Sequence, residues 1–292
     1  CASRTRTISA EELQLRQRYT CLRQARKISQ QAKAMCLLLV AHSSHDDYRL
    51  IVGANRDEFY TRAAADAALW DDQTGILGGR DLQGRGTWLA VNRAGRFAAI
   101  TNVRMPHPTA APRSRGLIIS DYLTNKLGAS RFVDELSKSA TAYEGFNILA
   151  ADPQSLAWFS NRAPEPRTLD AGVYGLSNHL LDTPWPKVTR IKAHFIAAQR
   201  FPEDALIEAI FKSLSNQETA PDRDLPETGI GLEHERILAP IFIAGDTYGT
   251  RCSTVVLIDR RGALTFIERR FGPHKALLGE SAFKFEIDAP SN

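Results

Sequence analysis

Pairs of short apolar runs, each pair joined by a few polar or turn-forming residues, constrain the fold of this chain more than any other feature. The pairs are residues 37–42 with 48–54, 87–91 with 97–103, 146–151 with 156–160, and 252–258 with 263–268. Runs of this length joined by short polar turns are typical of β-hairpins. We therefore expect antiparallel sheets, because parallel strands need long crossover connections.

Helical periodicity appears in separate blocks between the hairpins. In residues 204–214, for example, Leu206, Ile210 and Phe211 fall on one face of a helix. Residues 216–235 are rich in Pro, Asp and Gly and are expected to form a surface loop. Hairpins and helices in separate blocks predict an α+β fold of antiparallel sheets flanked by helices. The other two segments with helical periodicity are residues 116–126 and 186–199.

The positive net charge of the chain belongs to its first 34 residues. These contain eight Arg and Lys against two Glu, a net charge of +6, whereas the whole chain of 292 residues carries +4. Residues 35–292 therefore carry −2 and have no basic footprint for nucleic acid. We expect residues 1–34 to be a disordered or untranslated extension, with translation beginning at Met35, although an Arg-rich segment also suits an organelle transit peptide. Residues 35–292 are expected to form a single domain.

The cysteine pattern and the apolar runs argue against several other classes of protein. Cysteines stand at positions 1, 21, 36 and 252, too few and too scattered for a disulfide framework or a zinc site, so no metal is expected. The longest apolar run, residues 35–41, is much shorter than the roughly 20 residues that cross a bilayer. With no apolar signal segment either, we expect a cytoplasmic protein without stable membrane insertion.

Cys36 is the candidate for chemistry. If Met35 is removed, the thiol of Cys36 lies next to its own α-amine, whose ordinary pKa of about 7.7–8.0 suits a general base. Nucleophile and base then belong to one residue. A cysteine at the start of an apolar strand is otherwise commonly a small buried hydrophobic residue, and the sequence of this segment alone favours that interpretation.

A series of short motifs in a fixed order adds to the case for Cys36. Together they resemble the NRDE family, which includes the Transport and Golgi organisation 2 proteins and takes its name from a tetrapeptide that stands here at Asn55–Glu58. The likeness extends from Met35 to Phe285, and the N-terminal extension is its one clear departure from the family pattern. The motifs are Met35–Leu39, Tyr48–Tyr60, Gly78–Asp81, Gly86–Leu89, Thr101–Asn102, Gly145–Asn147, Tyr174–Asn178, Thr183–Trp185 and Tyr248–Arg251.

The resemblance implies an N-terminal-nucleophile-hydrolase-like αββα sandwich and a set of site residues. In cysteine amidases of that layout, an Arg and an Asp follow the nucleophile, then Asn residues near the oxyanion, then a late Arg. By this analogy Arg56 lowers the pKa of the Cys36 thiol and Asp57 holds the free amine. The remaining members are Asn102 and Asn178, which would donate to the oxyanion, and Arg251, which would orient the others.

Each of these residues also has a structural interpretation. Arg56 and Asp57 suit a structural ion pair at a strand end, and Glu58 suits a partner for a backbone amide or an Arg. Asn102 and Asn178 are also common types at turns and caps, and Arg251 suits a solvated cation on a strand edge.

The resemblance also leaves the function open between two main classes. One is a hydrolase of small-molecule amide or acyl bonds that needs no cofactor. The other is a carrier of haem, lipid or acyl-CoA, related in eukaryotes to Golgi organisation. A scaffold that kept an old hydrolase fold is a third option. The candidate haem ligands are Cys36, His42, His45 and His107.

Overall fold

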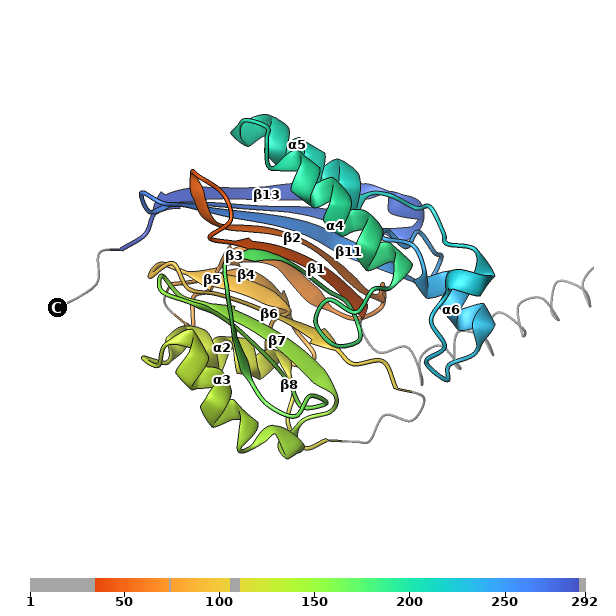
Figure 1. The fold of residues 1–292 in the computed structure, drawn as a ribbon, viewed down its shortest axis with the longest axis horizontal. Coiled ribbons are helices and arrows are strands. Elements are labelled where there is room, and N and C mark those ends of the chain that lie inside the picture. Colours follow the sequence, from red (N-terminus) through yellow and green to blue (C-terminus); the bar gives the residue numbers. More distant parts are fainter. Residues whose placement is uncertain (1–34, 74, 106–110, 289–292) are drawn as a thin grey trace, which may run out of the picture.

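The computed structural model describes residues 35–73, 75–105 and 111–288. The expected extension over residues 1–34 and the candidate ligand His107 lie outside these ranges. Two antiparallel sheets lie face to face, and helices cover the outer face of each (Figure 1). These four layers confirm the α+β class and the αββα sandwich expected from the sequence.

One sheet has six strands and joins segments from both ends of the described chain. Its centre pairs β2 with β1 on one side and with β11, almost 200 residues later, on the other. In spatial order the strands are β10 (Gly172–Leu176), β1 (Met35–His42), β2 (Tyr48–Phe59), β11 (Tyr248–Asp259), β12 (Ala263–Phe271) and β13 (Leu277–Glu286).

The second sheet has seven strands, which follow one another in space in the order of the sequence. Every neighbouring pair is antiparallel, and the connections are short except for residues 103–145, which contain two helices. The strands are β3 (Ala64–Leu69), β4 (Ile76–Asp81), β5 (Leu89–Asn92), β6 (Phe97–Asn102), β7 (Phe146–Ala151), β8 (Leu156–Ser160) and β9 (Arg167–Leu169).

Among the described residues, four helices form the outer layers and a fifth lies at one end of the sandwich (Figure 1). The helices α2 (Gly116–Thr124) and α3 (Ala129–Ser137) cover the seven-stranded sheet. The helices α4 (Pro186–Ala198) and α5 (Glu203–Leu214) cover the six-stranded sheet. The remaining helical elements are α6 (Leu232–Leu238) and the short 3-10 turns Ala140–Ala142, Asp222–Asp224 and Pro273–Lys275.

Strand alternation divides the apolar side chains of β1 between two cores. Leu38 and Val40 of β1 pack between the two sheets, whereas Leu37 and Leu39 pack against α4 and α5. Each such side chain, once fully buried, stabilises the fold by about 1.5–3 kcal/mol. The same alternation places the side chain of Cys36 on the face between the sheets, because it has the parity of Leu38.

The expected hairpins are all present, but the expected loop over residues 216–235 is only partly correct. Residues 232–238 form α6, whose Leu238 packs with Ile230 and Tyr248. Glu235 is also buried, because it forms an ion pair with Arg104. This polar segment therefore contains a helix, and the buried Glu235 carboxylate connects that helix to Arg104.

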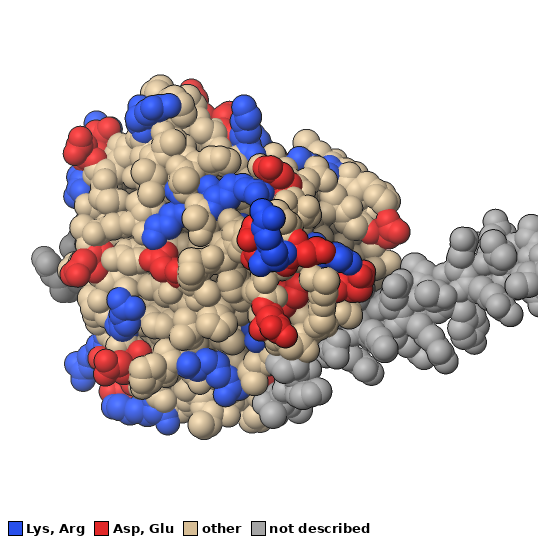
Figure 2. Space-filling view, turned by 45° about the vertical axis from the view of Figure 1, so that its right-hand side comes forward, with Lys and Arg blue, Asp and Glu red and all other residues tan. Residues whose placement is uncertain are grey.

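The surface charge and the helix lengths can be compared with those of nucleic-acid-binding and membrane-spanning proteins. On the face shown in Figure 2, Lys and Arg are interspersed with Asp and Glu, so this face has no continuous basic surface of the kind that binds nucleic acid. Among the helices of the described residues, none has the length and apolarity needed to cross a membrane.

Candidate functional site

The first two strands bring Cys36 and the tetrapeptide Asn55–Glu58 together. Cys36 lies opposite Arg56, and Met35 lies opposite Asp57, across the β1–β2 pair. Because side chains alternate along β2, Arg56 and Glu58 lie on the Cys36 side of the sheet. Asn55 and Asp57 lie on the side that faces the helices.

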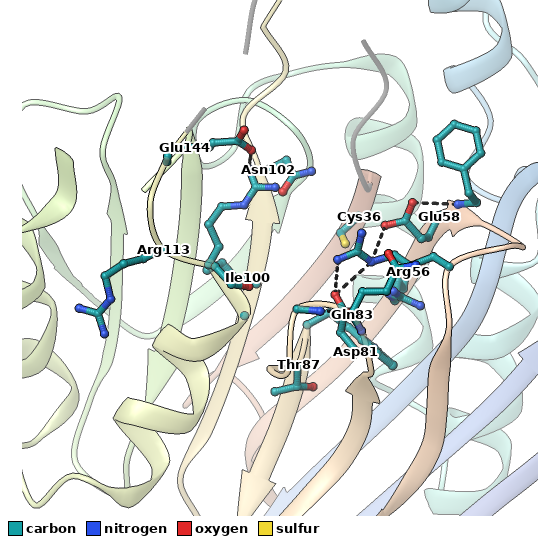
Figure 3. Close-up of a pocket in the computed structure, with 18 of the residues that line it drawn as sticks. Cys36, Arg56, Glu58, Asp81, Gln83, Thr87, Ile100, Asn102, Arg113 and Glu144 are labelled. Atoms are coloured by element: carbon teal, nitrogen blue, oxygen red, sulfur yellow. Dashed lines mark hydrogen bonds and ion pairs between the residues drawn. The ribbon is translucent and has the colours of Figure 1, made fainter. Parts of the chain in front are cut away.

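Cys36 borders a cavity of about 540 Å³ at one end of the space between the sheets. Figure 3 shows its sulfur atom between Asn102 of β6 and the β2 residues Arg56 and Glu58. A volume of this size is typical of small-molecule sites. The other charged or aromatic lining residues are Phe59, Arg62, Asp81, Trp88, Arg113, Arg115 and Glu144.

The Cys36 thiol is buried and poorly ionised in this setting. Burial is the main cause that raises its pKa, to about 12, and the nearby carboxylates of Asp57 and Glu58 add to the effect. The Arg56 guanidinium and a hydrogen bond from the Asp57 N–H act in the opposite direction. The thiol is therefore protonated at neutral pH, and a base must take its proton before sulfur can attack a substrate.

Arg56 is a buried cation that faces two cysteines. It lies opposite Cys36 on β1 and opposite Cys252 on β11, and its side chain is only 4% exposed. Its guanidinium carbon lies 4.1 Å from the centre of the Trp88 ring. Within the described part of the chain, Arg56 forms no ion pair and its side chain forms no hydrogen bond, so the structural ion pair with Asp57 that the sequence allowed is not observed. Its charge is available to the cavity.

The other charges on the cavity wall neutralise one another. Arg62 donates to Asp81 Oδ2 from Nη2 at 2.6 Å and lies 3.5 Å from Glu58 Oε2. Arg115 donates to the Gly145 carbonyl at 3.0 Å and lies 3.5 Å from Glu144. Of these residues, Asp81 and Glu58 stand in the sequence motifs given above. Arg62, Arg115 and Glu144 carry no such signal, because the fold rather than the local sequence brings the partners together.

Asp57 is a fully buried carboxylate on the opposite face of β2. Thr250 donates to its Oδ1 at 2.6 Å, and no described residue forms a hydrogen bond with Oδ2. Burial raises the pKa of Asp57 to about 6, an effect reduced by the Lys187 ammonium and by the Thr250 hydrogen bond. A positive charge placed opposite Asp57 on β1 would therefore meet an incompletely paired carboxylate.

The two asparagines lie next to each other beside Cys36. Asn178 Nδ2 donates to the Asn102 carbonyl at 3.1 Å, and Asn178 Oδ1 accepts a bond from Ser177 Oγ. Ser177 Oγ also donates to the Cys36 carbonyl at 3.3 Å. Asn102 lines the cavity, whereas Asn178 is completely buried behind it. The structure thus brings both residues to the site, and their oxyanion role stays a prediction.

Arg251 is not among the residues that line the Cys36 cavity. Its Nη1 donates to the carbonyls of Phe59 and Arg62, so it fastens the turn after β2. It lines a separate cavity of about 60 Å³ that shares Arg56 and Trp88 with the larger one. The structural role expected for Glu58 is confirmed, because its Oε1 accepts the Phe59 N–H at 2.9 Å and Oε2 lies near Arg62.

Two of the candidate haem ligands, His42 and His45, lie away from Cys36. His42 ends β1 six residues from Cys36, about 20 Å along an extended strand. His45 pairs with the Gln199 carbonyl at 2.8 Å in the turn beyond it. In residues 35–73, 75–105 and 111–288, no group of three or more His, Cys, Asp or Glu side chains could hold a metal ion.

Fold and site together define a four-layer αββα protein with a buried cysteine at a polar, arginine-containing cavity. The family model described as Transport and Golgi organisation 2 matches residues 35–273, and the chain belongs to this family.

Several relatives match most of their own length. The mouse Transport and Golgi organization 2 homolog is 36% identical over 246 residues, which cover 77% of this chain and 88% of that protein. The human homolog is 37% identical over 243 residues, with the same two coverages. The Drosophila melanogaster protein is 31% identical over 263 residues, 80% of this chain and 91% of that one.

Among solved structures, the chain is similar to a Caenorhabditis elegans N-acylethanolamine-hydrolyzing acid amidase ortholog. The TM-score is 0.42 at 15% identity, over 76% of this chain and 92% of that one.

Proposed function

We propose that this protein hydrolyses an amide or acyl bond of a small molecule, with Cys36 as nucleophile and the α-amine of Cys36 as general base. The observation that carries the proposal is the placement of Cys36 between a cavity of about 540 Å³ and the buried carboxylate of Asp57. Arg56, opposite Cys36, supplies a cation beside the sulfur.

The α-amine exists only in a chain that begins at Cys36. Removal of Met35 would empty the position opposite Asp57 and leave an amine there, next to the carboxylate whose Oδ2 forms no hydrogen bond with any described residue. With Met35 attached, the same nitrogen is an amide, which cannot accept a proton. Since burial keeps the thiol protonated, this base is what the site needs.

The reaction follows from these groups. The amine takes the thiol proton as sulfur attacks the carbonyl carbon, and donors near Cys36 stabilise the resulting oxyanion. The ammonium then gives the proton to the leaving amine or alcohol as its bond to carbon breaks, which leaves a thioester. Water, deprotonated by the same amine, hydrolyses the thioester and restores the thiol. The reaction requires no cofactor.

The first measurement is the intact mass and N-terminal sequence of the protein expressed from its natural gene. We expect a chain that begins at Cys36. Such a protein should hydrolyse members of a panel of small amides and thioesters, and Cys36→Ala should abolish this turnover. Cys252→Ala is the matched control, because Cys252 is also buried beside Arg56 and should not be needed.

Two results would overturn the proposal. One is a mature protein that keeps Met35, since it would have no free amine. The other is turnover that survives Cys36→Ala. Haem carriage, the competing prediction, would instead show as a haem absorbance band that Cys36→Ala shifts, although the charged cavity wall and the placement of His42 and His45 do not favour it.

A further inference from the structure

Lys187 is a buried cation that the proposed reaction does not yet use. It lies in the first turn of α4, directly after Pro186, and is only 5% exposed. Its Nζ donates to the Leu238 carbonyl at 3.0 Å. A buried ammonium at the positive end of a helix is doubly disfavoured, so an anion nearby must offset it.

The charged groups around Lys187 identify that anion. Asp57 of β2 and Glu235 of α6 attract the ammonium, as would an ionised Cys36 of β1, whereas Arg104, just after β6, repels it. Glu235 is already committed, because it pairs with Arg104 and accepts two hydrogen bonds from Thr228. Asp57 is the remaining carboxylate, and its Oδ2 has no hydrogen-bond partner among the described residues.

We propose that Lys187 is a positioning residue that keeps Asp57 ionised and offsets its charge, so that the α-amine of Cys36 stays neutral and can act as a base. This inference rests on the proposed function. An α-amine beside an uncompensated buried carboxylate would have its pKa raised by about 1–3 units above its ordinary value of about 7.7–8.0. It would then be an ammonium at neutral pH and could not take the thiol proton.

Lys187 and Asp57 also balance each other's charge while Met35 is still attached, before the α-amine of Cys36 exists. Burial is the main cause that lowers the pKa of Lys187, to about 8; Arg104 adds to this effect and Asp57 opposes it. Asp57 and Lys187 do not form a direct ion pair. Each nevertheless favours the charged form of the other. An amine formed at Cys36 enters a site whose negative charge is already balanced.

The first test uses the full chain and needs no substrate. The pKa of the Asp57 carboxyl, about 6 in the protein, is followed by ¹³C NMR against pH. Lys187→Met should raise it by about one unit or more, whereas Lys187→Arg should largely preserve it. Lys192→Met is the control, because Lys192 lies on the same helix in a partly exposed pair with Asp182. A shift below about 0.3 units in folded Lys187→Met would overturn the inference.

Asp57→Asn keeps the inference testable if Lys187→Met does not fold. Removing the carboxylate should lower the pKa of Lys187 below about 8, which ¹³C NMR of reductively methylated protein can follow. An unchanged Lys187 pKa in this variant would contradict the pairing.

The second test uses the chain that begins at Cys36. The ¹³C resonances of labelled Cys36 report the pKa of its α-amine, which Lys187→Met should raise by about 1–2 units. Adding Asp57→Asn to Lys187→Met should reverse that rise, because the uncompensated carboxylate is gone. An amine pKa that ignores both changes would overturn the inference. Since this readout needs no turnover, a protein that hydrolyses nothing would refute the proposed function without deciding the role of Lys187.

Discussion

Asn55 provides the sharpest test of how strand β2 divides its residues between stability and chemistry. Its side chain is 1% exposed on the helix side of the sheet. Nδ2 donates to the carbonyls of Leu214 and Ile241, both at 2.8 Å, and Oδ1 accepts a bond from Ser253 Oγ at 2.6 Å. Asn55 therefore ties the end of α5 and the segment before β11 to the centre of the six-stranded sheet.

We expect Asn55→Ala to lower the free energy of unfolding by about 3 kcal/mol. Three buried hydrogen bonds at about 1 kcal/mol each give this value, and the two carbonyls and the hydroxyl left unpaired keep it from being smaller. For a domain of this size, the loss corresponds to a fall in Tm of about 6–12 °C.

Urea unfolding followed by tryptophan fluorescence measures the change, with thermal unfolding as a second readout. Asn125→Ala is the matched control, because the exposed Asn125 side chain accepts one bond, from the Leu127 N–H. It should cost less than about 0.5 kcal/mol. A loss below about 1 kcal/mol for Asn55→Ala would refute the tethering role.

Three further predictions concern the charged and titrating groups. Arg104→Met leaves the buried Glu235 without its ion-pair partner and should destabilise the protein by about 3–5 kcal/mol in urea unfolding; a cost below 1 kcal/mol would contradict this. The Cys36 thiol, with its pKa raised to about 12, should react faster as pH rises. In Cys252→Ala protein that keeps Met35, the rate of Cys36 alkylation by iodoacetamide should increase about tenfold per pH unit from pH 7 to 10. A plateau in this rate below pH 9 would refute the raised pKa. The pKa of Lys187 falls from 10.5 to about 8 on folding, so the unfolded chain binds an extra proton between these two values. The free energy of unfolding should therefore rise with pH through this window. Unfolding free energies measured from pH 7.5 to 10.5 should show this gain in the wild type relative to Lys187→Met, and parallel curves for the two proteins would exclude it.

The strands that could be predicted from the sequence are those with local signals. Residues 146–151 and 156–160 form β7 and β8 with the expected bounds, because each is an apolar run beside a tight turn. Strand β4 lacked such a signal, because it contains Gly78 and Gly79. A Cβ on Gly79 would collide with the Trp88 ring, so glycine is required there by tertiary packing. Strand β13 is a sheet edge whose residues alternate between exposed and partly exposed, so it lacks a buried apolar face.

Site residues within a sequence motif could be predicted from the sequence, whereas residues brought together from distant segments by the fold could not. Cys36 and Arg56 follow from the motif order, and their pairing across β1 and β2 agrees with the expected hairpin. The expected strand ended at residue 54, whereas β2 continues to Phe59, so the alternation through Asn55–Glu58 was missed. Lys187 influences the charge of Asp57 from a helix 130 residues later, and no periodicity in the sequence relates the two.

The alternation through Asn55–Glu58 determines how changes in this tetrapeptide should be interpreted. Replacing all four residues together would cut a tether of α5, remove a buried cation, remove a buried carboxylate and loosen the turn after β2 in one step. A loss of any cellular role after such a replacement would be as consistent with lower protein abundance as with lost chemistry. Separate substitutions of Asn55 and Arg56, with protein levels measured for each, distinguish the two causes, because these neighbouring residues serve opposite faces of the same strand.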